Sequence, residues 1–164
     1  MPLFEACDLS VAYVGGGDGA PVRLAGVSFG LEAGAVYDLT GPSGAGKSML
    51  LRACARMMPL AAGRLLLDGT EGDALTCQEW RRRVCLVPQR ASLVPGTVRD
   101  NLLIPWALKV NRGRPAPSDA QLAQLMDAAL LDVPLDRDAA RLSGGQAARV
   151  ALLRAFATRP PVLL

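Results

Sequence analysis

The strongest chemical signal in this sequence lies in one short glycine-rich segment. It follows the pattern G-x-x-x-x-G-K-[ST], and its residues are Gly41, Pro42, Ser43, Gly44, Ala45, Gly46, Lys47 and Ser48. In a loop of this type the glycine backbone brings several N–H groups round one phosphate, and the lysine supplies a cation for the β- and γ-phosphates. The serine hydroxyl is the expected ligand of a Mg²⁺ ion. The segment therefore predicts a site for a nucleoside triphosphate.

The residues on either side of this loop favour the same interpretation. Residues 35–40 form a short, mostly apolar run that predicts a buried strand, and residues 48–57 are good helix formers without Gly or Pro. A strand-to-helix turn is the context that the motif requires, because the helix N-terminus adds its partial positive charge at the phosphate. The alternative is a glycine-rich turn with an incidental lysine.

A second segment further along the chain also combines a helix start with glycines. It reads Leu142, Ser143, Gly144, Gly145 and Gln146. Ser143 is a good N-cap, and Gln146 completes a capping box before the helix that we expect over residues 147–158. The two glycines leave bare N–H groups that a phosphate can approach closely. The alternative for this segment alone is an ordinary capped helix.

Together these two motifs resemble those of the ATP-binding subunits of ABC (ATP-binding cassette) transporters, and the resemblance covers essentially all of residues 1–164. It implies one α/β domain: a P-loop NTPase with a RecA-like core, an N-terminal antiparallel β subdomain and a helical subdomain at about residues 95–140. In that family the LSGGQ segment of one subunit closes over the γ-phosphate held by the loop of another. The resemblance therefore implies ATP and Mg²⁺ as cofactors, and a second ATP-binding subunit, in a head-to-tail homodimer, as a partner.

The resemblance also implies roles for single residues. We expect a strand over residues 83–89 that ends at Gln89, where the family has its Q-loop. The resemblance implies that Gln89 contacts Mg²⁺ or the attacking water; a solvated loop residue is the alternative. Tyr13 stands where the family has an aromatic residue that stacks on adenine, with an ordinary strand residue as the alternative. We expect Lys47, Gln89 and Ser143 to be catalytic and Ser48 and Gln89 to bind the metal. The expected nucleotide-binding residues are Tyr13, residues 41–48, Met49 and residues 142–146.

The last residues of the sequence differ from the family pattern. Residues 160–164 resemble the start of a strand that in the family ends in an Asp for Mg²⁺, followed by a catalytic Glu, and neither residue is present. The sequence also contains no histidine. We expect a C-terminally truncated form of a longer subunit that, on its own, binds nucleotide poorly and hydrolyses it barely, if at all. A degenerate, non-hydrolysing protein is the alternative.

Composition favours a globular domain and excludes other classes. Hydrophobic residues make up 51% of the chain, charged residues 20%, and the net charge is +3. Aromatic residues do not interleave with the densest basic run, residues 81–83, so we expect no nucleic acid partner. We expect no direct membrane insertion, because no apolar run approaches 18 residues. The four cysteines lack C-x-x-C spacing and indicate inert, reduced thiols.

Turn and cap residues predict the remaining elements. We expect strands over residues 3–13, 23–31 and 63–69, and a helix over residues 76–83 capped by Thr76. Thr97 caps a further helix, and Ser118 with Gln121 forms a capping box for a helix over residues 118–130. The apolar residues Leu102, Leu103, Ile104 and Trp106 are candidates for a groove that docks a transmembrane permease subunit, and subdomain core is the alternative.

The expected function is that of an ATPase that powers transport from the inner face of the cell membrane, as a cytoplasmic, peripheral subunit. Residues 91–102 resemble exporter-type subunits, and residues 103–106 resemble bacterial subunits linked to iron export. Two alternatives remain. A soluble ABC protein that acts on ribosomes or DNA usually has two cassettes or long insertions. A P-loop kinase for small molecules leaves residues 142–146 unexplained.

Overall fold

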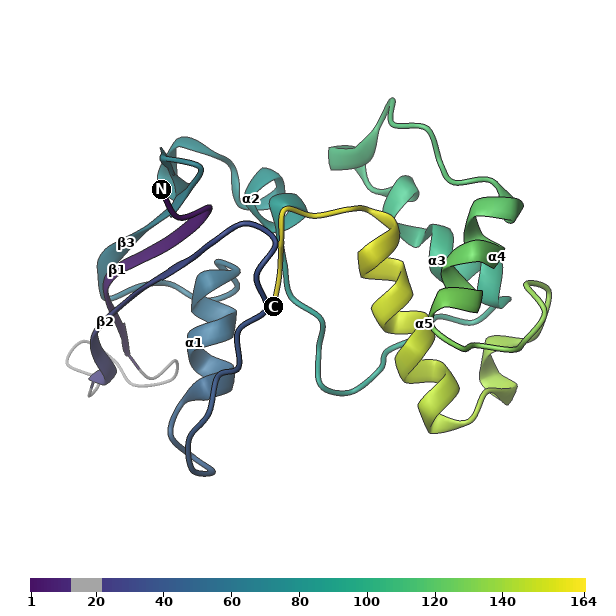
Figure 1. Cartoon of the computed structure of the whole chain (residues 1–164), viewed down its shortest axis with the longest axis horizontal. Coiled ribbons are helices and arrows are strands. Elements are labelled where there is room, and N and C mark those ends of the chain that lie inside the picture. Colours follow the sequence, from purple (N-terminus) through teal and green to yellow (C-terminus); the bar gives the residue numbers. More distant parts are fainter. Residues whose placement is uncertain (13–21) are drawn as a thin grey trace. The chain divides into compact units, whose positions relative to one another are not determined.

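The computed structural model describes residues 1–12 and 22–164 of the chain (Figure 1). The described residues form two compact units, of which the first comprises residues 1–86 with Leu164 and the second residues 87–163. The expectation of a single domain over residues 1–164 stays a prediction, as does the helical subdomain at about residues 95–140. Each unit has its own elements and its own buried side chains.

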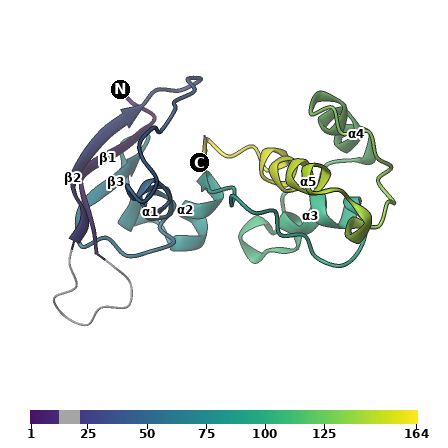
Figure 2. The same cartoon turned by 90° about the horizontal axis from the view of Figure 1, so that it is seen from below.

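The first unit contains a four-stranded antiparallel sheet in the order β2-β1-β3-β4 (Figure 2). Its strands are β1 (Phe4–Ala12), β2 (Val22–Leu31), β3 (Ala62–Leu67) and β4 (Thr70–Glu71). Phe4 of the central strand pairs with Leu31 on one side and Leu67 on the other. The predicted strands over residues 3–13, 23–31 and 63–69 are thus confirmed where the structure describes them, as is the antiparallel N-terminal sheet.

A bulge changes which side chains of β1 face the core. Phe4 and Ala6 are buried before it, and Leu9 and Val11 after it, so the alternation of burial shifts by one residue. At the bulge Asp8 has a φ of 50°, and its backbone lies so close to Gly63 that a Cβ there would meet the Asp8 carbonyl oxygen at 2.5 Å. The bulge therefore requires a glycine on the neighbouring strand.

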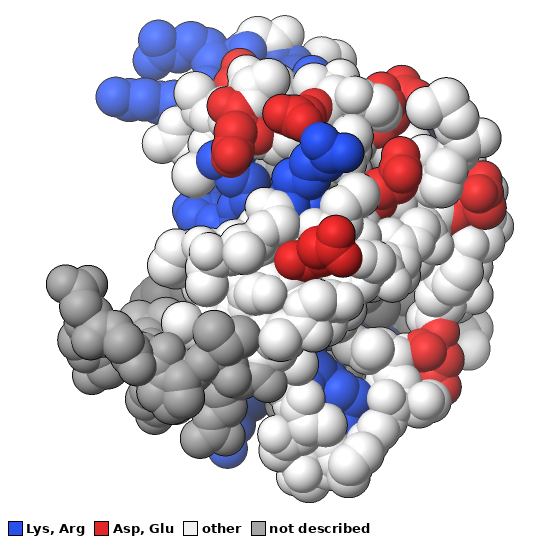
Figure 3. All heavy atoms as spheres, turned by 90° about the vertical axis from the view of Figure 1, so that its left-hand side faces the viewer, with Lys and Arg blue, Asp and Glu red and all other residues white. Residues whose placement is uncertain are grey.

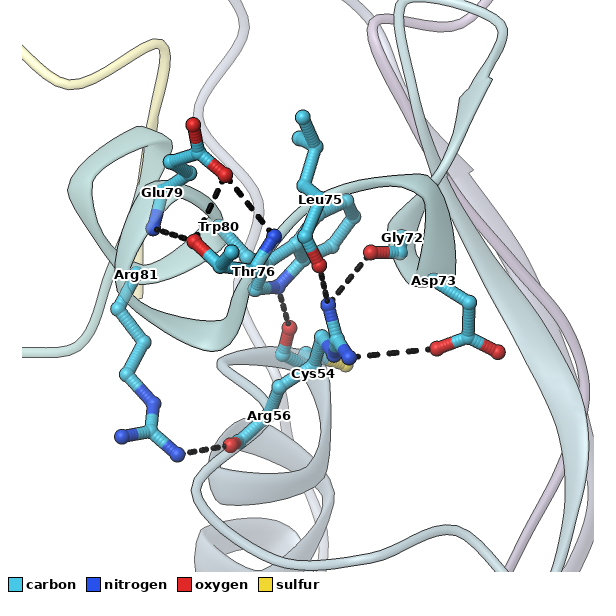
Figure 4. A network of polar contacts seen from close by, with 9 residues as sticks. All are labelled: Cys54, Arg56, Gly72, Asp73, Leu75, Thr76, Glu79, Trp80 and Arg81. Atoms are coloured by element: carbon cyan, nitrogen blue, oxygen red, sulfur yellow. Dashed lines mark hydrogen bonds and ion pairs between the residues drawn. The ribbon is translucent and has the colours of Figure 1, made fainter.

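Helix α1 (Lys47–Cys54) packs on this sheet, and α2 (Cys77–Arg83) holds its C-terminal end (Figures 1 and 4). The fully buried Trp80 donates its indole N–H to the Cys54 carbonyl at 2.8 Å, and its ring packs on Phe4 at a centroid distance of 6.2 Å. The Arg81 guanidinium donates to the Arg56 carbonyl just beyond the helix. Burial raises the pKa of the Cys54 thiol to about 12, which keeps it protonated.

Arg56 fixes the loop that joins the sheet to α2 (Figure 4). Its guanidinium donates to the carbonyls of Gly72 and Leu75 and pairs with Asp73 at 3.3 Å. These contacts hold the short 3₁₀ turn η1 (Gly72–Ala74) against the end of α1. After α2, the strand β5 covers only Val84–Cys85, so it is shorter than the strand predicted over residues 83–89.

The predicted buried strand over residues 35–40 is wrong. The structure has no strand there, and Val36 is 99% exposed, Tyr37 52% and Leu39 43%. A strand needs backbone partners from a neighbouring strand, and none of the strands in the described ranges pairs with this segment. The local contact that does form is a hydrogen bond from the Glu32 N–H to the Tyr37 hydroxyl at 2.9 Å.

The second unit is helical around one hydrophobic cluster. Its elements are α3 (Val98–Ala107), η2 (Lys109–Asn111), α4 (Asp119–Ala128), η3 (Ala139–Arg141), α5 (Gly144–Ala157) and β6 (Val162–Leu163). The buried cluster combines side chains of α3, α4 and α5, and consists of Val98, Leu102, Leu122, Met126, Leu131, Val150 and Leu153. Leu102 is only 1% exposed, so it belongs to this core rather than to an open groove.

Capping boxes begin four of the described helices; the sequence predicts two of these boxes, at Ser118 and Ser143, and a cap at Thr76 and Thr97. Thr76 with Glu79, Ser118 with Gln121 and Ser143 with Gln146 each exchange reciprocal hydrogen bonds. Thr97 forms a fourth box with Asp100. Hydrogen bonds from Thr76 lower the pKa of Glu79, and hydrogen bonds from Thr97 lower that of Asp100. Within residues 1–12 and 22–164 no helix is both long enough and apolar enough to cross a membrane.

Acidic and basic side chains are mixed on the face drawn in Figure 3. Ion pairs elsewhere on the surface join the two signs, such as Arg99 with Asp119 and Arg64 with Glu71 at 3.5 Å. A protein that binds a nucleic acid backbone usually presents a basic patch or stripe. The face in Figure 3 has no large patch of one sign.

Replacing Trp80 with Phe should lower the free energy of unfolding by about 1–3 kcal/mol. The buried Cys54 carbonyl then loses its donor, while an aromatic ring still packs on Phe4. Urea denaturation followed by circular dichroism measures the change. Cys77→Ser, at an exposed position on the same helix, should alter the stability by less than about 0.5 kcal/mol. Equal effects of the two variants would contradict the anchoring role of Trp80.

Candidate functional site

The glycine-rich loop 41–48 leads directly into α1 in the first unit. Gly46 is the N-cap and has a φ of 92°, in the left-handed region that favours glycine. A Cβ at this position would also stand 3.0 Å from Cδ2 of Leu24 on β2. Gly46 therefore serves two purposes, since it turns the chain into the helix and lets the loop approach the sheet.

The N-terminus of α1 differs from those of the other α-helices. Its N-cap provides no side-chain hydrogen bond and its first turn contains no acidic residue, whereas α2, α3, α4 and α5 each begin with a capping box. The first N–H groups of an α-helix have no partner within the helix and carry its partial positive charge. At α1 these donors are left without a side-chain cap of their own, which suits an anionic ligand.

Lys47 bends its side chain back over the loop. Its ammonium donates to the Gly41 carbonyl at 2.6 Å and to the Pro42 carbonyl at 2.9 Å. An ammonium has three donors, so it can contact a phosphate oxygen while it keeps part of this contact. Next to it, Ser48 is exposed and Met49 is half-buried. The loop thus combines a cation, a hydroxyl and helix N–H groups within one short segment.

The start of α5 in the second unit is capped and also open. The Ser143 hydroxyl accepts a hydrogen bond from the Gln146 N–H at 3.3 Å, and the Gln146 side chain accepts one from the Ser143 N–H at 2.9 Å. The hydroxyl hydrogen of Ser143 is not used in the cap, so it can be donated to a ligand. A Cβ at Gly144 or Gly145 would meet nothing within 4 Å. Packing within the described structure therefore does not explain these two glycines.

Gln89 lies in the second unit and is exposed. The chain that follows it is held in place at Ser92, whose carbonyl accepts a hydrogen bond from Arg154 at 3.0 Å, and at Val94, which exchanges two hydrogen bonds with the buried Asn101. We did not predict the contacts of Arg154 and Asn101 from the sequence. A polar residue inside an apolar helix was the available signal for Asn101.

The structure brings the candidate residues together in two groups. The loop residues 41–49 share the first unit, and Gln89 shares the second unit with residues 142–146. Tyr13 lies outside the described residues. Within the described ranges no group of three or more His, Cys, Asp or Glu side chains could hold a metal ion. The hydroxyl of Ser48 and the amide oxygen of Gln89 are hard donors of the kind that Mg²⁺ prefers, and Mg²⁺ usually takes its other ligands from phosphates and water.

Comparison with known proteins gives one consistent family. The family model described as "ABC transporter" matches residues 24–164. The "Methionine import ATP-binding protein MetN" of Caulobacter vibrioides is 40% identical over 162 residues, which are 96% of this chain and 47% of that protein. The "Probable iron export ATP-binding protein FetA" of Escherichia coli is 37% identical over 86% of this chain and 61% of its own length. The chain thus spans about half the length of these relatives.

A solved structure supports the fold assignment. The ATP-binding cassette MJ0796, in a dimeric post-hydrolysis state bound to ADP and Pi, matches 98% of this chain and 72% of its own with a TM-score of 0.80 and 26% identity. The expected α/β fold of a P-loop NTPase is therefore confirmed.

Two glycine substitutions should have opposite effects on stability. Gly46→Ala should destabilise the first unit by roughly 1–2 kcal/mol, because alanine is strained at this left-handed φ and its Cβ meets Leu24. Gly145→Ala should stabilise α5 by about 0.5 kcal/mol, because the added methyl group meets open space and alanine favours the helix. Urea denaturation measures both. A destabilising Gly145→Ala would mean that packing, after all, requires this glycine.

Proposed function

The chain belongs to the ABC transporter family, and from that premise we propose that it is the ATP-binding part of a transporter that hydrolyses ATP to drive transport. The observation that carries this proposal is the start of α1, where the glycine-rich loop, Lys47 and an uncapped first turn meet. A helix start of this kind suits the phosphates of a nucleotide. The comparison with a cassette bound to ADP and Pi supports ATP as that nucleotide.

The proposed site is composite. Residues 41–48 of one copy hold the triphosphate, and residues 142–146 of a second copy close over the γ-phosphate in a head-to-tail homodimer. Two features support this arrangement: the open space at Gly144 and Gly145, and the dimeric state of the similar cassette. The absence of acidic residues from the first turns of both α1 and α5 also favours it, because neither helix start repels a phosphate.

We assign the roles in this site by chemistry. Lys47 neutralises the β- and γ-phosphates, and the Ser143 hydroxyl with the N–H groups of α5 stabilises the γ-phosphate as it is transferred. Ser48 and Gln89 would hold Mg²⁺, which when bound offsets the phosphate charge. Gln89 also orients the attacking water, and Tyr13 stacks on adenine. The other residues of the loop and of the 142–146 segment, together with Met49, shape the site.

The proposed partner is a transmembrane permease subunit, which holds the chain at the cytoplasmic face of the membrane. We propose export as the direction, because residues 91–106 resemble exporter-type subunits and FetA is described as an iron export protein. MetN, which is described as an import protein, has a similar identity to this chain. Copurification of the complete protein with a multi-span membrane protein, followed by transport in vesicles, tests both partner and direction.

Residues 1–164 alone should bind ATP poorly and turn it over barely. The sequence contains no acidic residue after Asp138, and a carboxylate near the phosphates is the usual means of positioning Mg²⁺ and water.

Lys47→Ala should weaken ATP binding by at least about tenfold, because the phosphates then lose their cation. Titration calorimetry with Mg-ATP measures the affinity. Arg52→Ala is the matched control, because Arg52 is an exposed cation on the same helix and we assign it no contact with nucleotide. Equal losses of affinity in the two variants would indicate a general effect of charge and contradict the phosphate role of Lys47.

Ser143→Arg in the complete protein should abolish turnover and leave ATP binding mostly intact, because the bulky cation blocks the segment that closes over the γ-phosphate. The ATPase rate and the ATP affinity are measured side by side. Ser118→Arg removes an equivalent N-cap from α4, and therefore controls for the loss of about 1 kcal/mol that accompanies any lost cap. Normal hydrolysis by the Ser143 variant would refute the composite site.

A further inference from the structure

We propose that Arg154 is a positioning residue that holds the segment carrying Gln89 against the helix that begins at Ser143. This inference rests on the proposed function, since that function gives Gln89 and Ser143 their roles. The residues involved all lie in the second unit, so the argument needs only contacts within one compact body.

The contact itself is a hydrogen bond between distant parts of the sequence. Nη2 of Arg154 on α5 donates to the Ser92 carbonyl at 3.0 Å, and the two residues are 62 positions apart. Ser92 is the first residue after Gln89 that takes part in a hydrogen bond in the described structure. Arg154 therefore supplies the anchor nearest to Gln89 on this side.

Beyond Ser92 the segment has further anchors that do not depend on Arg154. Leu93 packs against the hydrophobic cluster of the unit. The fully buried Asn101 accepts from the Val94 N–H at 2.8 Å and donates to the carbonyls of Val94 and Thr97 at 3.0 Å each. Loss of the Arg154 contact would thus lengthen the segment after Gln89 that has no hydrogen bond to the rest of the unit. The unit itself would remain folded.

The same helix presents Ser143 at one end and Arg154 about three turns further on. Because a helix is stiff over this length, the bond from Arg154 sets the position of the Gln89 segment relative to the Ser143 end. Arg154 is half-buried, and its guanidinium makes the contact through one nitrogen. A residue that orients water or Mg²⁺ must be held closely, since small displacements reduce turnover strongly.

The test compares three variants. Arg154→Ala removes the bond, and Arg154→Lys keeps a cation and a donor at the same place. Arg114→Ala is the matched control, because Arg114 also donates from Nη2 to a backbone carbonyl at 3.0 Å, but to Thr158 beyond the far end of α5. The rate of tryptic cleavage after Arg90, which follows Gln89 and is exposed, is measured by mass spectrometry, and kcat and KM for Mg-ATP are measured in the complete protein.

We expect Arg154→Ala to speed tryptic cleavage after Arg90 by about fivefold or more, with cleavage within α4 and α5 unchanged. We also expect kcat to fall about tenfold while KM for ATP stays within about twofold, because the loop at residues 41–48 that binds the phosphates is untouched. Arg154→Lys should restore both values to within about twofold of the wild type, and Arg114→Ala should change neither.

The outcomes separate this inference from the proposed function. An unchanged rate of cleavage after Arg90 in Arg154→Ala would overturn the positioning role, whatever the ATPase rate. An equal loss of kcat in Arg114→Ala would also overturn it, since the effect would then follow from damage to the unit as a whole. If the complete wild-type protein shows no ATPase activity, the proposed function fails, and the cleavage rates still decide whether Arg154 anchors the segment.

Discussion

The uncapped start of α1 is the feature on which the rest of the structure depends. A helix end that is left open for a ligand gives up a stabilising cap, and the glycine that begins α1 adds conformational freedom to the unfolded chain. The structure offsets this at the other end of the same helix, where Trp80 donates to the carbonyl of Cys54, the last helical residue, and Arg81 donates to the Arg56 carbonyl just beyond the helix. The helix is thus held at its C-terminal end, and its N-terminus can remain available.

The start of α5 combines helix stability and access for a ligand in another way. Here a serine caps the helix with its own oxygen and keeps its hydroxyl hydrogen for a ligand, so stability and availability come from one side chain. A Cβ at either of the glycines beside it would meet no atom within 4 Å. Because glycine has no side chain, a phosphate can approach the backbone there. The two helix starts are therefore suited to different tasks: α1 holds an anion, and α5 closes over one.

Sequence reasoning succeeded where the interactions are local. The capping boxes at Ser118 and Ser143 depend on residues three positions apart, so their patterns are visible in the sequence, and the structure confirms them together with the predicted cap at Thr76. The loop of residues 41–48 is equally local. The strand predicted over residues 35–40 is wrong because a strand needs a partner strand from a distant part of the sequence. An apolar run predicts burial, but it does not identify the strand with which it would pair.

The same distinction explains which functional residues the sequence left hidden. The contact of Trp80 with Cys54 joins residues 26 positions apart, and that of Arg154 with Ser92 joins residues 62 positions apart. No pattern of residue types in the sequence predicts such pairs. Yet these contacts decide how rigidly the motifs are held. The two units have separate buried clusters, so each half-site has its own support. If the proposed function holds, nucleotide binding and turnover can therefore be altered separately, because the side chains that fix the phosphate loop are not those that fix the Gln89 segment.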